Sequence, residues 1–182
     1  MDSALVEKAK KGDKDSFAAL YEEVADDLYR VALYTLGNVH DAQDAVAETF
    51  LEAYRGLGSL RENTSFKAWM MRILSCRCKR HIGRYVRDRG TLDIEELTDL
   101  GDEGGAQEQG IARADLLTAL ASLAPAERQI IVLSVIEGYT MKETAAMLRS
   151  PQGTVSSKLH RALGKLRRLL AEPAASGKGV GV

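Results

Sequence analysis

The sequence predicts an all-α protein in which two small helical domains are joined by a flexible acidic linker. Three observations carry this prediction: apolar residues recur at three- and four-residue spacing, no segment alternates as a half-buried strand does, and acids and bases fall into separate blocks. We expect the first domain to cover residues 1–90, the linker 91–112 and the second domain 113–172. Residues 173–182 are rich in small residues and are expected to form a disordered tail.

Composition limits the class of protein. The chain has 182 residues, of which 45% are hydrophobic and 28% are charged, which suits one large domain or two small ones and excludes wholesale disorder. Residues 1–11 are charged and lack the apolar core of a signal peptide, and no run of residues is apolar enough to cross a bilayer. We therefore expect a cytoplasmic protein without membrane insertion.

Glycine residues mark the ends of the first two predicted helices. Gly12 ends a short N-terminal helix. Apolar residues then recur at helical spacing from Ser16 to Leu36, and Gly37 supplies the left-handed residue that commonly follows a helix. The first domain is therefore expected to begin with one short and one long helix.

The third predicted helix runs from His40 to Arg55 and has an apolar side and an acidic side. The acidic stripe consists of Asp41, Asp44, Glu48 and Glu52. Carboxylates in the first turn of a helix interact favourably with its dipole by about 0.5 kcal/mol each, which would explain Asp41 and Asp44 without any binding role. The pattern alone leaves both explanations open.

A basic helix is predicted from Phe66 to Arg89, after a glycine-containing loop and a capping serine, Ser65. Its bases are Lys67, Arg72, Arg77, Lys79, Arg80, Arg84, Arg87 and Arg89, against the single acid Asp88. Trp69 could stack on a nucleic-acid base, but its helical spacing with Phe66 and Ile73 favours a place in the core. The bases are the better candidates for contacts with phosphate.

The predicted linker carries acids and no base. Its acids are Asp93, Glu95, Glu96, Asp99, Asp102, Glu103 and Glu108, and its glycine content indicates flexibility. Because opposite charges on a flexible tether attract, one hypothesis is that the linker folds over the basic helices in the free protein and suppresses DNA binding.

A helix-turn-helix is predicted in the second domain. Thr140 and Glu143 form a capping box, so a helix should start at Met141 and stop near Arg149. The dipeptide Ser150-Pro151 disfavours a continuing helix and suits a new start. A second helix should then run from Pro151 to about Leu170.

The second helix of this motif is basic on its outer face. Between Gly153 and Leu170 lie Lys158, His160, Arg161, Lys165, Arg167 and Arg168, with no acid among them. An ordinary amphipathic helix with a solvated face would carry the same charges. The paired caps and the short break favour a helix that reads the major groove of DNA.

Two cysteines and a histidine lie close together in the basic helix. Cys76, Cys78 and His81 could suggest a metal site or a redox switch. Residues two apart on a helix point to different faces, and no second ligand cluster has zinc spacing. We expect two reduced thiols, no metal and no cofactor.

At the level of motifs the chain resembles bacterial RNA polymerase sigma factors of the sigma-70 family, in the small extracytoplasmic-function (ECF) group. The resemblance rests on residues 41–51, 65–73, 123–128, 137–140 and 153–159, which occur in the order of the family. It implies a fold with a sigma region 2-like helical bundle followed by a sigma region 4-like helix-turn-helix. It covers nearly the whole chain except the linker and the tail.

Membership would imply a protein without enzymatic activity of its own. The family binds core RNA polymerase, directs it to promoter DNA through the minus-10 and minus-35 elements, and is held inactive by an anti-sigma protein. No glycine-rich phosphate loop, metal box or activated nucleophile points to an enzyme instead. The alternative is a stand-alone dimeric helix-turn-helix regulator, which leaves the basic helix of the first domain unexplained.

The resemblance also assigns residues to each surface. Core-polymerase binding falls to Asp41, Asp44, Glu48, Phe50 and Leu51. Minus-10 DNA binding falls to Arg61, Asn63, Ser65, Lys67, Arg77, Arg80 and Arg84. Minus-35 DNA binding falls to Arg149, Thr154, Ser157, Lys158, Arg161 and Lys165.

The sequence departs from the family at two places in the helix-turn-helix. Ser156-Ser157-Lys158 stands where many relatives carry Lys-Ser-Arg, and Arg149 stands where Gly is frequent. A cation lost at position 156 weakens phosphate attraction and makes the preferred promoter sequence harder to predict.

Overall fold

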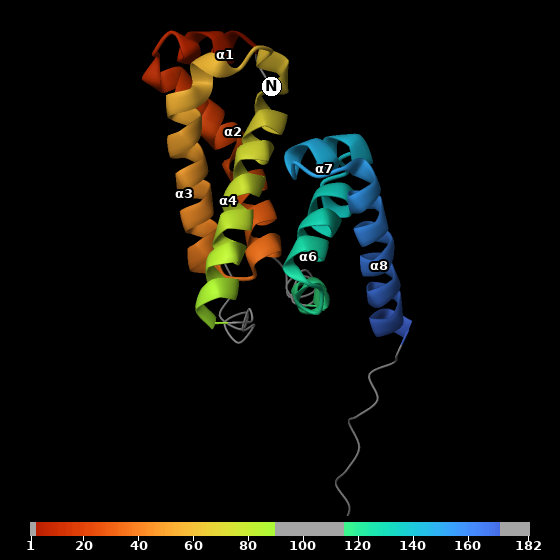
Figure 1. The fold of residues 1–182 in the computed structure, drawn as a ribbon. Helices are drawn as coiled ribbons and strands as arrows, with labels where there is room; N and C mark the ends of the chain where they lie inside the picture. The colour runs from red at the N-terminus through yellow and green to blue at the C-terminus, as the bar shows by residue number, and fades with distance from the viewer. Residues whose placement is uncertain (1–2, 90–114, 172–182) are drawn as a thin grey trace, which may run out of the picture.

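The computed structural model describes residues 3–89 and 115–171, and every regular element within these two ranges is a helix (Figure 1). The all-α prediction is confirmed. The predicted acidic linker and the predicted tail lie outside the described residues, and so does the hypothesis about the linker acids.

The first helical unit is a bundle of long helices. It contains α1 (Ser3–Lys10), α2 (Lys14–Leu36), α3 (Val39–Gly56) and α4 (Phe66–Arg89), with two 3-10 turns, η1 (Leu57–Ser59) and η2 (Asn63–Ser65), before α4. In Figure 1, α3 and α4 run side by side with α2 behind them, and α1 crosses one end of the bundle. This end also carries the turns that lead into α4.

Local capping sets the bounds of these helices. The Asp13 carboxylate accepts hydrogen bonds from the amides of Asp15 (3.0 Å) and Ser16 (3.4 Å), so α2 begins two residues before the predicted Ser16. Gly37 has φ of +71° and its amide donates to the carbonyl of Leu33 at 2.8 Å, as predicted. Before α3, the Asn38 side chain accepts from the amide of Asp41 at 2.9 Å.

The second helical unit contains the helix-turn-helix. A helix over residues 115–121 is followed by α6 (Pro125–Ile131), which continues into a π-helical turn, η4 (Val132–Ile136). Then come α7 (Met141–Met147) and α8 (Gln152–Ala171). The wider π turn was not predicted, because its residues Val132 to Ile136 look like any buried helical run.

The predicted capping box before α7 is confirmed. The hydroxyl of Thr140 accepts from the amide of Glu143 at 3.2 Å, and the Glu143 carboxylate accepts from the amide of Thr140 at 2.9 Å. Helix α8 starts one residue later than predicted. The carbonyl of Pro151 accepts from the amides of Thr154 and Val155, which makes the proline the cap and not the first helical residue.

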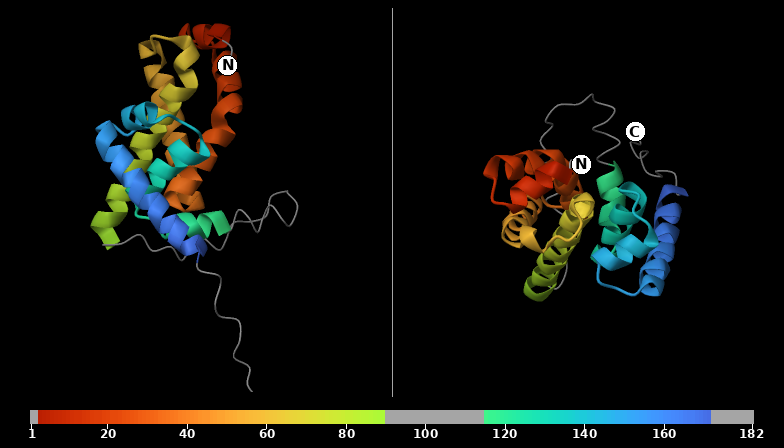
Figure 2. Two further views of the ribbon diagram at one scale, coloured as in Figure 1. Left: turned by 90° about the vertical axis from the view of Figure 1, so that its right-hand side faces the viewer. Right: turned by 90° about the horizontal axis from the view of Figure 1, so that it is seen from above.

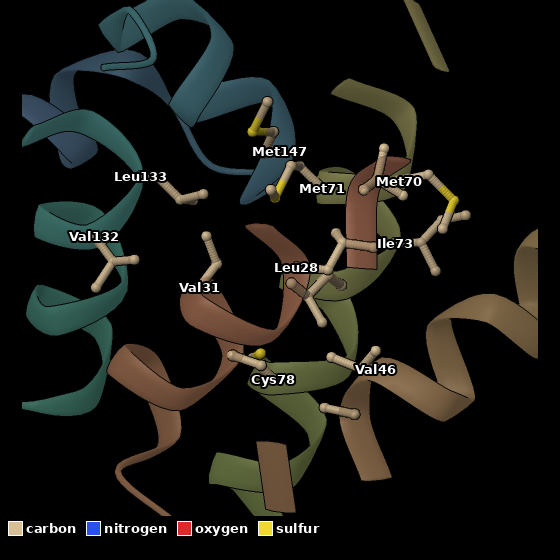
Figure 3. Packing of buried hydrophobic residues seen from close by; sticks show 14 of the residues in the cluster. Leu28, Val31, Val46, Met70, Met71, Ile73, Cys78, Val132, Leu133 and Met147 are labelled. Carbon is tan, nitrogen blue, oxygen red and sulfur yellow. The ribbon is translucent and has the colours of Figure 1, made fainter. Parts of the chain in front are cut away.

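The two helical units pack against each other, as the view from above in Figure 2 shows. A single buried cluster extends across the junction between them. Figure 3 shows Val31 of α2 and Met71 of α4 on one side, with Leu133 and Met147 of the second unit on the other. All four side chains are buried, so this contact excludes water.

A buried arginine lies at the same junction. The Nη1 atom of Arg128 donates to the carbonyl of Thr35 in the last turn of α2 at 3.3 Å. Its Nη2 atom lies within hydrogen-bond distance of the carbonyls of Ala121 (3.5 Å) and Leu123 (3.4 Å), at the end of the preceding helix. Arg128 is 3% exposed, and no carboxylate among the described residues pairs with it. One guanidinium thus serves the ends of two helices from different units.

Replacing Arg128 with Met should lower the free energy of unfolding by about 2 to 4 kcal/mol, because buried carbonyls lose a charged donor while most of the side-chain volume remains. Urea unfolding followed by circular dichroism measures this change. The control is R167M, because Arg167 is exposed on α8 and its loss should change the value by less than about 0.5 kcal/mol. Equal stability of R128M and the unaltered protein would contradict the capping role.

Candidate nucleic-acid interface

Helix α8 exposes its polar and basic residues on the side away from the bundle. Thr154, Ser157 and Arg161 are exposed, while Val155 and Ala162 of the same helix are buried against the second unit. Figures 1 and 2 show α8 at the outer edge of the molecule, remote from α3. Its N-terminal half is therefore open to a groove of DNA even while the two units are packed together.

Two further predicted residues of this surface have intramolecular partners or partial burial. Lys165 donates to Glu127 of α6 at 2.7 Å, and this bond holds the pKa of the Glu127 carboxyl below its ordinary value. Lys158 is half-buried. A phosphate that contacts Lys165 would thus compete with a carboxylate of the same chain.

The turn between α7 and α8 is strained at Arg149, which has φ of +48°. The amide of Ser150 donates to the carbonyl of Ala145 at 3.0 Å, and the amide of Arg149 to that of Ala146 at 3.3 Å. These two bonds form a Schellman motif, whose left-handed position usually holds Gly. A residue with an L side chain adopts this left-handed conformation at a cost of about 1 kcal/mol. Arg149 therefore destabilises the turn relative to Gly.

Some of the basic residues of α4 form ion pairs with acids of α3, and others do not. Arg77 donates to Glu48 (3.3 Å) and, through Nε, to Glu52 (2.8 Å), and Arg84 lies 3.6 Å from Glu48. Arg80 is exposed and has no ion pair with any residue that the structure describes. Of these three predicted DNA contacts, only Arg80 is available without breaking a contact to α3.

The acidic stripe of α3 is correspondingly shared with α4. His81 is 3% exposed and lies between Asp41 and Glu48, with each of its ring nitrogens 3.5 Å from one carboxylate. Asp44 is exposed and, within the described ranges, forms no ion pair. The stripe therefore has an inner side that holds α4 and an outer side that faces solvent.

An apolar surface adjoins the outer side of α3. Leu51 is 58% exposed and Tyr54 is 52% exposed, whereas Phe50 is buried against the ring of Tyr21 at a centroid distance of 4.2 Å. A hollow of about 360 Å³ lies beside them, lined by Glu48, Leu51, Glu52, Arg55, Gly56 and Arg77. Large exposed apolar side chains with a polar rim are typical of a protein-binding surface.

The loop before α4 is tied to α1. The Asn63 side chain accepts from Lys10 at 2.6 Å and donates to Glu7 at 3.1 Å, and the Ser65 hydroxyl donates to Glu62 at 3.4 Å. Arg61 is exposed on the same loop. Ser65 was predicted to cap α4, whereas the hydrogen bond of its hydroxyl in the structure goes to Glu62.

The two cysteines of α4 differ in burial. Cys78 is fully buried, and burial raises the pKa of its thiol to about 12, so it is a weak nucleophile at neutral pH. Cys76 is half-buried, and both cysteines are free. Trp69 is partly buried against the core and packs near Phe66 at a centroid distance of 6.1 Å, in agreement with the interpretation as a core residue.

The sequence matches two family models in the order of the two helical units. The model described as sigma-70 region 2 matches residues 20–89, and the model described as sigma-70 region 4 matches residues 119–168. The ECF RNA polymerase sigma factor SigM of Mycobacterium tuberculosis is 32% identical over 170 residues, which are 93% of this chain and 84% of SigM. The chain belongs to the ECF sigma factors. It directs promoter-specific transcription initiation by RNA polymerase.

Other relatives agree with this assignment. The ECF sigma factor SigW of Bacillus subtilis is 29% identical over 178 residues and the match covers 92% of this chain and 95% of SigW. BldN of Streptomyces coelicolor is 30% identical over 175 residues, but the match covers 93% of this sigma factor and only 66% of BldN. The sequence of this chain therefore spans about two thirds of BldN and nearly all of SigW.

Solved structures share the fold. The sigma factor RpoE of Bartonella quintana, solved in complex with the anti-sigma factor NepR, superposes with a TM-score of 0.68 at 25% identity, covering 86% of this chain and 98% of RpoE. CnrH, solved with the cytosolic domain of CnrY, gives the same TM-score at 24% identity, covering 94% of this chain and 99% of CnrH. No helix in the described part of this sigma factor is long and apolar enough to cross a membrane.

Sequence reasoning missed the polar residues at the junction of the two units. Arg30 of α2 donates to Glu137 at 3.0 and 3.1 Å, and Gln129 of α6 donates to the carbonyl of Ser75 in α4 at 3.0 Å. One local signal was available. Arg128 and Gln129 directly precede four consecutive apolar residues, Ile130 to Leu133, and polar residues in such a buried helix need specific partners.

Replacing Arg149 with Gly should raise the free energy of unfolding by about 0.5 to 1 kcal/mol, because Gly adopts the left-handed conformation without a steric cost. R149A is the matched variant, since it also removes the guanidinium but keeps the strain, and it should not gain stability. Thermal unfolding distinguishes the two. Both variants should weaken binding to a fluorescent DNA duplex to the same extent, and equal stabilisation by Gly and Ala would contradict the strain.

Proposed function

We propose that this sigma factor binds core polymerase and the minus-10 element through residues 1–90, and the minus-35 element through residues 113–172. One observation carries the proposal: exposed bases occur on two separate helices of one chain, α4 and α8. A monomer that holds two DNA elements at once needs two such surfaces, because each contact with a duplex or single strand is made largely through phosphates.

The outer side of α3 is the proposed docking surface for core polymerase. Its centre is Leu51, flanked by exposed Tyr54 and by the unpaired carboxylate of Asp44. Binding energy in protein interfaces is concentrated in a few large side chains that become buried. Phe50, which precedes Leu51, is buried and fixes this part of α3 through its contact with the ring of Tyr21. Asp41 and Glu48 contribute from the inner edge, where they also hold α4.

The loop before α4 and the exposed side of α4 form the proposed minus-10 surface. Its residues are Arg61, Asn63, Ser65, Lys67, Arg77, Arg80 and Arg84. Arg61 and Arg80 can meet phosphates directly, whereas the other members must first exchange an intramolecular partner. Such exchanges cost little, because partly exposed ion pairs contribute about 1 kcal/mol or less. An extruded base would be held where Asn63 and Ser65 lie.

The proposed minus-35 surface is the N-terminal half of α8 with the preceding turn. Thr154, Ser157, Lys158 and Arg161 would read the major groove or its edges, and Arg149 and Lys165 would contact the DNA backbone. Exposure of Thr154, Ser157 and Arg161 on the outer face of α8 supports this role. Ser156 supplies no cation there, so fewer phosphate contacts are available than in a helix with lysine at that position.

We expect no catalytic activity of its own from this sigma factor, and its work on polymerase and chromosomal DNA places it in the cytoplasm. An anti-sigma protein is the expected regulator, because RpoE of Bartonella quintana, which shares the fold, was solved with one. A stand-alone dimeric regulator is not favoured, since it gives no role to the sigma-70 region 2 match over residues 20–89.

Transcription of a promoter library by purified core RNA polymerase, with and without this protein, tests the proposal. We expect transcripts that start at a fixed distance from a shared two-part motif. R161Q should lose selection of the upstream part and R80Q should weaken dependence on the downstream part, because each removes one cation from one surface. The same motif with or without the protein would contradict a sigma function.

Replacing Leu51 with Asp should weaken binding to core polymerase by about tenfold or more, because a charge replaces an exposed apolar side chain at the centre of the proposed interface. Fluorescence anisotropy of the labelled protein with core enzyme measures the affinity. The matched control is E22Q, which alters an exposed residue of α2 outside the three surfaces. Binding to duplex DNA should remain unchanged in L51D, and unchanged affinity for core enzyme would move the docking surface elsewhere.

A further inference from the structure

Four charged side chains form a continuous chain of contacts between the two helical units. Lys67, at the start of α4, donates to one oxygen of Asp27 in α2. Arg30 donates to the other oxygen of Asp27 at 2.8 Å. The Nε and Nη2 atoms of Arg30 also donate to Glu137 of the second unit, at 3.1 and 3.0 Å. A lysine of the proposed minus-10 surface is thus linked to a carboxylate of the unit that carries α8.

The four charges balance. Two cations, Lys67 and Arg30, face two carboxylates, Asp27 and Glu137. The hydrogen bond from Lys67 holds the pKa of the Asp27 carboxyl below its ordinary value, against the opposite effect of burial, so this carboxylate stays charged at neutral pH. If Glu137 leaves, one excess positive charge remains beside the loop that precedes α4. That charge would attract a phosphate.

The side chain of Glu137 is nearly enclosed at the junction of the two units. Its side chain is 6% exposed, and it follows directly after the π turn η4, before Gly138 with φ of +73°. Two further bonds hold the same junction, Gln129 to the carbonyl of Ser75 and Arg128 to that of Thr35. The net charge of the group around Lys67 is therefore zero when the second unit is docked and positive when it is not.

Separation is required for binding both promoter elements. The names of the minus-35 and minus-10 elements place them about 25 base pairs apart, which corresponds to about 85 Å at 3.4 Å per pair. A compact chain of this length has a radius of gyration of about 16 Å and is about 40 Å across, so the closed form cannot contact both elements. Opening of the junction and binding of the promoter must accordingly occur together.

We propose that Glu137 competes with promoter phosphate for the cation pair Arg30 and Lys67, so that docking of the second unit neutralises the minus-10 surface and DNA binding favours undocking. The proposal rests on the proposed function, in that Lys67 contacts the minus-10 strand. When Glu137 departs, both arms of the Arg30 guanidinium can turn to Asp27, and the Lys67 ammonium is released. By linkage, single-stranded DNA opens the junction by the same factor by which opening strengthens its binding.

The test uses E137Q in the full-length protein, because glutamine keeps the size of the side chain and removes its charge. Two quantities are measured: the affinity for a fluorescent 12-nucleotide oligodeoxythymidine at low salt, and the rate at which the Lys67 amine is acetylated without DNA, read by mass spectrometry. We expect about three- to tenfold tighter binding and faster acetylation. E22Q, which removes an exposed acid of the first unit outside the charge chain, should change neither.

A second background shows whether the effect passes through Lys67. In K67Q the gain in DNA affinity from E137Q should disappear, because the released ammonium is missing. A gain of the same size in K67Q would overturn the proposal in favour of general opening of the molecule. D27N provides an independent variant if E137Q does not fold, since it also leaves one excess positive charge, and it should strengthen binding likewise.

The two measurements separate failure of this proposal from failure of the proposed function. Unchanged acetylation and unchanged affinity in both E137Q and D27N would overturn the competition, because the charge chain would then not control Lys67. Faster acetylation with unchanged DNA affinity would also overturn the proposal, because it would show that Lys67 does not contact the minus-10 strand. In that case the library experiment would still report a sigma factor.

Discussion

The buried guanidinium of Arg128 is the contact on which the relative placement of the two units depends. Carbonyl groups at helix C-termini carry partial negative charge and lack partners within the helix. Arginine has five donors and stays charged even where burial lowers its pKa, as it does here. It can therefore serve Thr35 at the end of α2 and Leu123 after the preceding helix together. The buried cluster that includes Met71, Leu133 and Met147 extends across the same junction.

Polar contacts between helices also determine which charges of α3 and α4 are free. The acids proposed for polymerase and the bases proposed for DNA lie on neighbouring helices, and Arg77 and His81 join them in the free protein. These pairs hold α4 in place and reduce the positive field that the helix presents. Because the partly exposed pairs of Arg77 are weak, a phosphate or a polymerase side chain can replace one of their partners without unfolding the bundle. The intact pairs are thus compatible with binding and do not argue against it.

In this sigma factor, packing of the two units against each other opposes simultaneous contact with both promoter elements. The closed form buries Val31 and Met71, which favours docking of the second unit, but it is too short to contact both promoter elements. Glu137 connects these opposed requirements, because it leaves the first unit at the moment when Lys67 must become available. Binding of core polymerase and promoter DNA to the separated units would supply the free energy for this exchange.

The sequence by itself determined the helices of the first unit, the two helices of the helix-turn-helix, their order and the family; it did not predict the 115–121 helix or α6. Capping by Thr140 and Glu143 acts within four residues, so Met141 could be predicted as a helix start, and errors at Asp13 and Pro151 amounted to one or two residues. The same local rules identified α8 as a basic helix with a free outer face. They could not reveal that Lys67 is held by Asp27, or that Arg30 contacts Glu137 at a separation of 107 residues. Helical periodicity gives the face on which a side chain lies but not the neighbour it meets, and only the packing of the two units decided that.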